Sequence, residues 1–93
     1  VVLRSDAKIE NNNGKDQIVA YSIPYLVNKA QMIEKTSDLV KDGIIEGITA
    51  IRDESDKDGY RVVYDLRKDS IPNVVLNNLY KYTQLQTSFS VNN

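Results

Sequence analysis

The sequence predicts an α+β fold in the order β-β-α-β-β-α, with one mixed four-stranded sheet and the helices packed on one face. Two patterns carry this prediction. Apolar and polar residues alternate over residues 1–10 and 60–67, and apolar residues recur at helical spacing over 26–40. Because 93 residues suffice for only one small core, residues 1–93 are predicted to form a single domain. The sheet is expected to be mixed because a right-handed crossover would lay the third strand parallel to the second.

The first hairpin is predicted from the alternation at the start of the chain. One face of a strand over residues 1–10 would carry Val1, Leu3, Ser5, Ala7 and Ile9. Residues 11–16 contain asparagine and glycine, which tolerate the positive φ of a tight turn. Residues 17–23 are rich in β-branched and aromatic side chains, so they are expected to form the returning strand, which Pro24 should end.

The first helix is predicted to follow that proline. Its expected buried stripe has helical spacing and consists of Leu26, Ala30, Ile33, Ser37 and Val40. A glycine after a polar residue often ends a helix, so the end is expected near Asp42 and Gly43.

A second hairpin and a second helix complete the predicted fold. Residues 44–52 and 60–67 are expected to be strands joined by a polar turn. Pro72 suits the first turn of a helix, where its missing N–H is not needed, and the preceding Asp69 and Ser70 are candidates for the cap. The buried stripe of this helix is predicted to contain Val75, Leu76, Leu79 and Tyr82.

The composition excludes most enzyme chemistry. The chain has no cysteine and no histidine, which removes thiolate catalysis and the most common general base. Residues 54–65 imitate the oxygen ligands of a calcium loop, but the strand pattern after Gly59 favours an acidic hairpin turn. Tyr80 and Tyr82 are expected to pack in a core or an interface rather than act as nucleophiles. We therefore predict no catalytic, metal-ligating or cofactor-binding residue in the chain.

The charge of the chain bears on nucleic-acid binding. The net charge of −1 gives no overall electrostatic signature of a DNA-binding protein, so a contact with DNA requires that cations gather on one face. The two predicted hairpins offer such a set, on a polar sheet face that could touch phosphates without reading bases. The candidate contacts with the DNA backbone are Arg4, Lys8, Arg61, Arg67 and Lys68.

Three longer strings of the sequence are informative when each is taken whole. They are Ile23-Pro24-Tyr25-Leu26-Val27-Asn28-Lys29-Ala30, Arg52-Asp53-Glu54-Ser55-Asp56-Lys57-Asp58-Gly59, and Val74-Val75-Leu76-Asn77-Asn78-Leu79-Tyr80-Lys81 running into Thr83-Gln84-Leu85-Gln86-Thr87-Ser88-Phe89. Together they resemble the A subunit of bacterial type IIA topoisomerases, DNA gyrase in particular. The resemblance covers nearly the whole chain in the same order and with matching spacing.

The resemblance implies a role in DNA topology. In that family these strings belong to the tower, an α/β element of the breakage-reunion region that supports the flanks of the cleaved duplex while it is bent. The parent enzyme would change supercoiling by ATP-dependent double-strand breakage, passage and resealing. The family nucleophile lies in an Ala-x-x-Arg-Tyr-Thr string. Its nearest imitation, residues 79–83, lacks the alanine spacing and the arginine, so the catalytic tyrosine is expected outside this chain.

The same resemblance implies partners and cofactors. The partners would be double-stranded DNA and the gyrase B subunit, with two copies of the A subunit forming a homodimer in an A2B2 complex. ATP and Mg²⁺ would be used through the B subunit, in the bacterial cytoplasm at the nucleoid and not at a membrane. The chain begins at Val1 without an initiator methionine or a signal peptide, which predicts an internal fragment. Two alternatives stay open: the A subunit of topoisomerase IV, and a stand-alone α+β protein-interaction module whose likeness is misleading.

Overall fold

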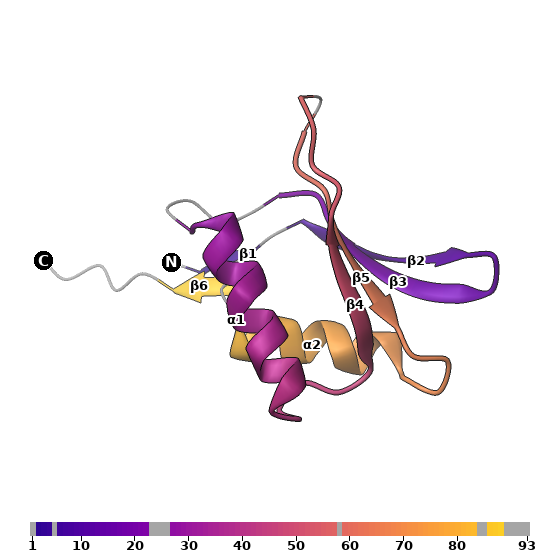
Figure 1. Ribbon diagram of the computed structural model, residues 1–93. Coiled ribbons are helices and arrows are strands. Elements are labelled where there is room, and N and C mark those ends of the chain that lie inside the picture. Colours follow the sequence, from indigo (N-terminus) through magenta and orange to yellow (C-terminus); the bar gives the residue numbers. More distant parts are fainter. Residues whose placement is uncertain (1, 5, 23–26, 58, 84–85, 89–93) are drawn as a thin grey trace, which may run out of the picture.

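The computed structural model describes residues 2–4, 6–22, 27–57, 59–83 and 86–88, which form two helices and two antiparallel sheets (Figure 1). The elements follow the chain as β1 (Val2–Arg4), β2 (Ala7–Asn12), β3 (Lys15–Ala20), α1 (Lys29–Lys41), β4 (Ile48–Asp53), β5 (Val62–Leu66), α2 (Pro72–Tyr82) and β6 (Gln86–Ser88). The predicted α+β class is confirmed, and the predicted β-β-α-β-β-α order is that of β2, β3, α1, β4, β5 and α2.

The four-stranded sheet is antiparallel throughout, so the prediction of a mixed sheet is wrong. Its strand order is β2-β3-β5-β4, and each neighbouring pair is antiparallel. Strands β3 and β4 run in the same direction, as a crossover through α1 requires, but β5 lies between them and pairs with both. The error therefore concerns which strands are adjacent and not the direction of the third strand.

Burial explains why β5 rather than β4 occupies the central position. Residues 62–64 of β5 are fully buried, whereas most residues of the edge strands β2 and β4 are exposed. A strand that is apolar on both faces loses the most contact with water when it has a neighbour on each side. The charged strands take the edges, where unpaired backbone groups remain in water.

Both helices lie on one side of this sheet, as predicted, with α1 against β4 and α2 against β3 (Figure 1). The core between the helices and the sheet consists of Ile18, Ala20, Met32, Leu39, Ile45, Ile48, Val62, Tyr64, Leu66, Val75 and Leu79. Lys29 Nζ, at the start of α1, forms an ion pair of 2.9 Å with Asp53 Oδ2 on β4. The hydrogen bond from Lys29 lowers the pKa of the Asp53 carboxyl. Neither helix in the described part of the chain is long and apolar enough to span a membrane.

The ends of α1 are set by local hydrogen bonds. Asn28 is the N-cap, and its side-chain oxygen accepts from the Gln31 N–H at 3.1 Å. At the other end Gly43 has a φ of 77°, and the N–H groups of Gly43 and Ile44 donate to the carbonyls of Val40 and Leu39 at 3.1 and 3.0 Å. These two bonds form a Schellman motif, so the predicted end near Gly43 is confirmed.

The buried stripe of α1 differs from the predicted one. The buried residues are Met32, Thr36 and Leu39, whereas Ala30 is exposed and Leu26 lies outside the described residues. Thr36 can be buried because its hydroxyl donates to the Met32 carbonyl at 2.8 Å. Ile33 and Val40 of the predicted stripe are half-buried and pack against the core, so the prediction is right in part.

Helix α2 begins at Pro72 as predicted, although neither polar cap candidate caps it. The N-cap is Ile71, which makes no side-chain hydrogen bond to the helix. The predicted stripe is largely confirmed: Val75 and Leu79 are buried and Leu76 packs against the core, but Tyr82 is 40% exposed.

The start of the chain forms two strands rather than the single predicted strand over residues 1–10. Strand β1 pairs with β6 in a separate two-stranded sheet, while β2 pairs with β3. The partner of β1 lies more than eighty residues away in the sequence. Local alternation could therefore predict extended backbone here but not the change of sheet.

Candidate nucleic-acid interface

One face of the four-stranded sheet is not covered by a helix in the described part of the chain. We call it the open face. Its side chains belong to Lys8, Glu10, Gln17, Val19, Tyr21, Arg52, Glu54, Arg61, Val63 and Asp65. Val19 and Val63 lie opposite each other at its centre and are 0% exposed, although neither belongs to the helix-side core. The long polar side chains around them must therefore exclude water, as amphipathic side chains commonly do.

Two arginines on the open face are held by carboxylates. Arg52 binds Asp65 with two hydrogen bonds of 3.0 Å, and its third contact is a bond of 2.8 Å from Nη1 to Glu54. Arg61 Nε donates to the other oxygen of Glu54 at 3.0 Å. Gln17 Nε2 donates to Asp65 at 2.8 Å and extends the network to β3. The guanidinium charges in the middle of this face are therefore already compensated.

Tyr21 joins the network to the edge of the sheet. Its hydroxyl donates to Glu10 and accepts from Arg61 Nη1 at 3.4 Å. Lys8 Nζ and Arg61 Cζ lie 5.7 and 5.8 Å from the centre of its ring, within the range of a cation–π contact. The hydrogen bond to Glu10 raises the pKa of Tyr21, and the bond to Glu54 raises the pKa of Arg61. Tyr21 therefore stays neutral at physiological pH, and the cations gather around an uncharged ring.

The structure does not bring all five predicted cations together. Lys8 and Arg61 meet at Tyr21, whereas Arg67 and Lys68 lie at the other end of β5, in the turn that leads to α2. Arg4 lies on β1, in the two-stranded sheet, so its predicted place in the same hairpin as Lys8 is wrong.

Two charged residues of this region were missing from the candidate list. Arg52 belongs to the network, and Lys15 lines the same hollow as Arg67 and Lys68. Alternation along β4 would have placed Arg52 on the polar face, but the one-residue irregularity between Ile48 and Ala50 obscures that pattern. Lys15 could be placed only once the register of β3 on β5 was known.

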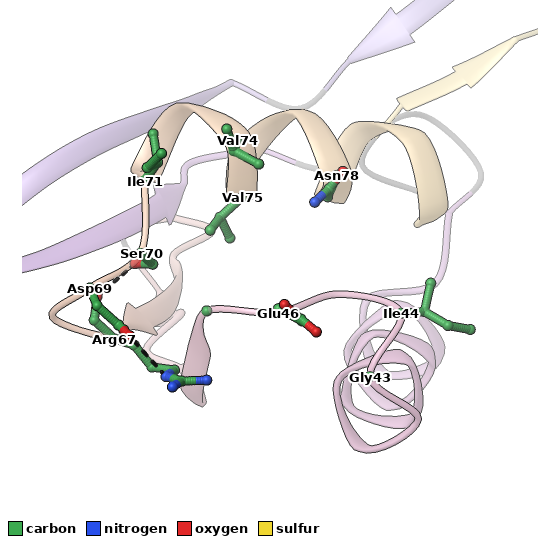
Figure 2. A pocket seen from close by; sticks show the side chains of 11 residues that line it. Gly43, Ile44, Glu46, Arg67, Asp69, Ser70, Ile71, Val74, Val75 and Asn78 are labelled. Carbon is green, nitrogen blue, oxygen red and sulfur yellow. Dashed lines mark hydrogen bonds and ion pairs between the residues drawn. The ribbon is translucent and has the colours of Figure 1, made fainter.

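Hydrogen bonds hold the backbone of the turn that carries Arg67 and Lys68. The Arg67 N–H donates to the Gly47 carbonyl at 2.6 Å, and the Ser70 hydroxyl donates to the Arg67 carbonyl at 2.6 Å. Figure 2 shows this turn beside the hollow between residues 43–47 and α2, with Val75 directed into it. Both bonds involve the backbone of Arg67, so they fix the position from which the turn starts.

The acidic residues of the calcium-like segment have other partners. Glu54 binds Arg52 and Arg61, and Asp65 binds Arg52 and Gln17. Among the described residues there is no group of three or more acidic residues arranged to hold a metal ion. Asp58 lies outside the described residues. The charged groups on this face thus form a network of paired cations and carboxylates.

An α+β module with a charged sheet face is compatible with many functions, because a fold alone does not determine what a protein does. Comparison with known proteins is more specific. The sequence profile of the family that comprises the A subunits of DNA gyrase and topoisomerase IV matches residues 1–93. The chain therefore belongs to the DNA gyrase/topoisomerase IV A-subunit family, and the resemblance to gyrase A is confirmed.

Individual relatives agree with the family profile. The DNA gyrase A subunit of Halalkalibacterium halodurans is 54% identical over 92 residues, covering 99% of this chain and 11% of that protein. The corresponding protein of Escherichia coli K12 is 51% identical over 89 residues, covering 96% of this chain and 10% of that protein. That of Fibrobacter succinogenes is 53% identical over 94 residues, with 100% and 10% covered. The chain spans about a tenth of the length of these relatives, and the likeness is not accidental.

Proposed function

We propose that this chain is the part of a bacterial gyrase A subunit that supports and contacts the flanks of the duplex which the parent enzyme cleaves. The observation that carries the proposal is the family match over all 93 residues, which places the chain in a DNA topoisomerase family. The parent would cut both strands of one duplex, pass a second duplex through the gap and reseal the break. The chain would contribute no catalytic residue, since the nucleophilic tyrosine is expected elsewhere in the parent protein.

The physical task of such a support is to offset the cost of DNA bending. Bending a short duplex costs on the order of 1–10 kcal/mol, and the cost falls on the flanks as well as on the centre. Contacts between cations and phosphates along the flanks recover part of that energy and require no particular base sequence. The contacts proposed from the sequence are Arg4, Lys8, Arg61, Arg67 and Lys68.

The remaining components belong to the parent complex. We expect the A subunit to act as a homodimer with two B subunits in the cytoplasm, and the B subunits to bind the ATP and Mg²⁺ that drive strand passage. The A subunit of topoisomerase IV is the alternative parent. The glycine-containing box that marks gyrase wrapping lies in the C-terminal domain of the family, so reading that domain of the parent separates the two.

A charge-removal experiment in the full-length A subunit, assembled with its B subunit, tests the proposal. We expect the combined variant R67Q and K68Q to reduce both supercoiling and the bending of a duplex labelled at its ends, because phosphate contacts on the flanks are lost. Cleavage of a duplex too short to reach the flanks should persist. Unchanged bending and supercoiling, in a variant with the melting temperature of the parent, would remove DNA support as the function of this chain.

A further inference from the structure

The cations of the four-stranded sheet differ in whether a carboxylate already neutralises them. In the middle of the open face, Arg52 and Arg61 share Glu54, and Arg52 also binds Asp65 through two hydrogen bonds. Each arginine keeps N–H groups outside these contacts, but the carboxylates already offset its positive charge, so a phosphate gains less electrostatic attraction there. A site of low net charge displaces few counterions from DNA, and counterion release is the main source of non-specific affinity.

A second group of cations lies at one end of the same face. Gln17 on β3 is opposite Asp65 on β5, and their side chains are hydrogen-bonded on the open face. The β3–β5 ladder ends at this pair. Lys15 and Arg67 each lie two residues beyond it along the chain, and period-two alternation favours the open face for both. Lys68 follows in the turn, and all three cations line one hollow between the β2–β3 hairpin and that turn, which Arg52 and the carboxylates of Asp16, Asp65 and Asp69 also line. We call Lys15, Arg67 and Lys68 the basic end.

The basic end is only weakly neutralised. Within the described part of the chain, neither Lys15 nor Lys68 forms an ion pair. Arg67 has one, with Asp69 at 3.5 Å, and the two side chains are 57% and 77% exposed. An ion pair so long and so exposed exchanges readily for another anion. Arg52, in contrast, has three contacts of 2.8 to 3.0 Å.

We propose that the basic end, and not the centre of the open face, is where this chain holds the DNA phosphates. The proposal rests on the proposed function, because the ligand is the DNA of the parent enzyme. Lys15 and Lys68 supply point charges and Arg67 supplies a fork that can hold two oxygens of one phosphate. The hydrogen bonds of the Arg67 backbone to Gly47 and Ser70 hold the turn that carries Arg67 and Lys68. Arg52 and Arg61 are positioning residues that hold β4 and β5 together and cover Val19 and Val63.

Three double variants that each remove two positive charges separate the basic end from the other cations. They are K15Q/K68Q at the basic end, K8Q/R61Q beside the Tyr21 ring on the open face, and K35Q/K41Q on α1, on the opposite side of the sheet. Each is made in the full-length A subunit with its B subunit. The measured quantity is the dependence of affinity on salt concentration, for one duplex that extends past the cleavage core on both sides and for one that does not.

We expect K15Q/K68Q to reduce the slope of log K against log salt by about two on the long duplex, since each lost phosphate contact contributes about 0.9. The slope on the short duplex should not change, and K15R/K68R should restore the slope on the long one. K8Q/R61Q and K35Q/K41Q should leave both slopes unchanged. Equal melting temperatures for K15Q/K68Q and K15R/K68R exclude misfolding as the cause.

Two outcomes overturn the inference in distinguishable ways. If K8Q/R61Q lowers the slope on the long duplex and K15Q/K68Q does not, the phosphates lie beside the Tyr21 ring on the open face and the proposed function stands. If no variant on the sheet changes the long-duplex slope, the chain does not hold the flanks, and the proposed function fails together with the inference.

Discussion

Gly47 decides, at the scale of a single residue, whether the turn with Arg67 and Lys68 can be formed. Its φ is 96°, and a Cβ placed there would lie 2.9 Å from Ser70 Cβ and 3.0 Å from Val75 Cγ2. We expect Gly47→Ala to lower the free energy of unfolding by about 3 kcal/mol, from left-handed backbone strain and from the displaced neighbours. Denaturant unfolding of the 93-residue chain measures the change.

Gly43 provides the matched control for Gly47. It also has a positive φ, of 77°, but nothing lies within 4 Å of an added Cβ. Gly43→Ala should therefore cost only the backbone strain, about 1–2 kcal/mol. Equal losses for the two variants would show that the close approach of Gly47 to the turn is not what holds the turn in place.

Tyr60 makes the stability of the fold depend on pH in the alkaline range. Burial, and secondarily the negative charge of Asp53, raises the pKa of Tyr60 to about 12. The folded pKa thus lies above the value of about 10 for an unfolded tyrosine. As pH rises through this interval, the unfolded chain releases the proton of Tyr60 while the folded chain retains it. The contribution of this group to the free energy of unfolding is therefore fully present below about pH 10 and is lost as pH rises toward 12.

A phenylalanine at position 60 tests this linkage. The Tyr60 hydroxyl has no hydrogen-bond partner among the described residues, so Tyr60→Phe should change stability little at neutral pH. Between about pH 9 and about pH 11 the variant should lose less stability than the parent chain, because one ionisable group is gone. Parallel stability curves for the two proteins over that range, from urea unfolding, would contradict the assignment.

At the scale of elements, α2 closes the core through Leu79. This side chain is 0% exposed and packs among the core residues of the sheet. Leu79→Ala should cost roughly 2–5 kcal/mol, because it leaves a cavity that the surrounding strands cannot fill. A domain of this size has a total stability of a similar order, so the variant should be largely unfolded near 37 °C as judged by circular dichroism.

Val74 is the matched control on the same helix. It is 51% exposed, and its truncation should change stability by no more than about 0.5 kcal/mol. A Leu79→Ala variant that melts at the same temperature as Val74→Ala would mean that α2 does not complete the core.

Elements were predictable from the sequence where the signal is local. The alternation in β5, the proline of α2 and the glycine after α1 each act within a few residues, and each located its element. The alternation over residues 1–10 predicted extended backbone but not the break between β1 and β2. The order of strands was not predictable in this way. It depends on which strand gains most from two neighbours, and that is a property of the whole sheet.

At the scale of the whole molecule, the open face shows what a sequence can say about a binding surface. Alternation predicted a polar face with cations, and the face exists. It could not predict that Glu54 would lie between Arg52 and Arg61, because that contact depends on the register of β4 on β5 and on an irregularity in it. Residue type alone therefore did not distinguish compensated cations from available ones.

The available charge also limits how strongly the chain can bind DNA without the rest of the parent protein. With a net charge of −1 and about three cations at the basic end, attraction to a duplex is weak. We expect a Kd of ~10⁻⁴ M or weaker at physiological salt, and a slope of log K against log salt of about −3. Fluorescence anisotropy of a labelled duplex at several salt concentrations measures both, with K15Q/K68Q as the comparison. If the chain were a protein-binding module, it would show no affinity for the duplex even at low salt. A tight complex that does not depend on salt would also contradict the prediction, because it requires contacts with bases that a face of this kind does not offer.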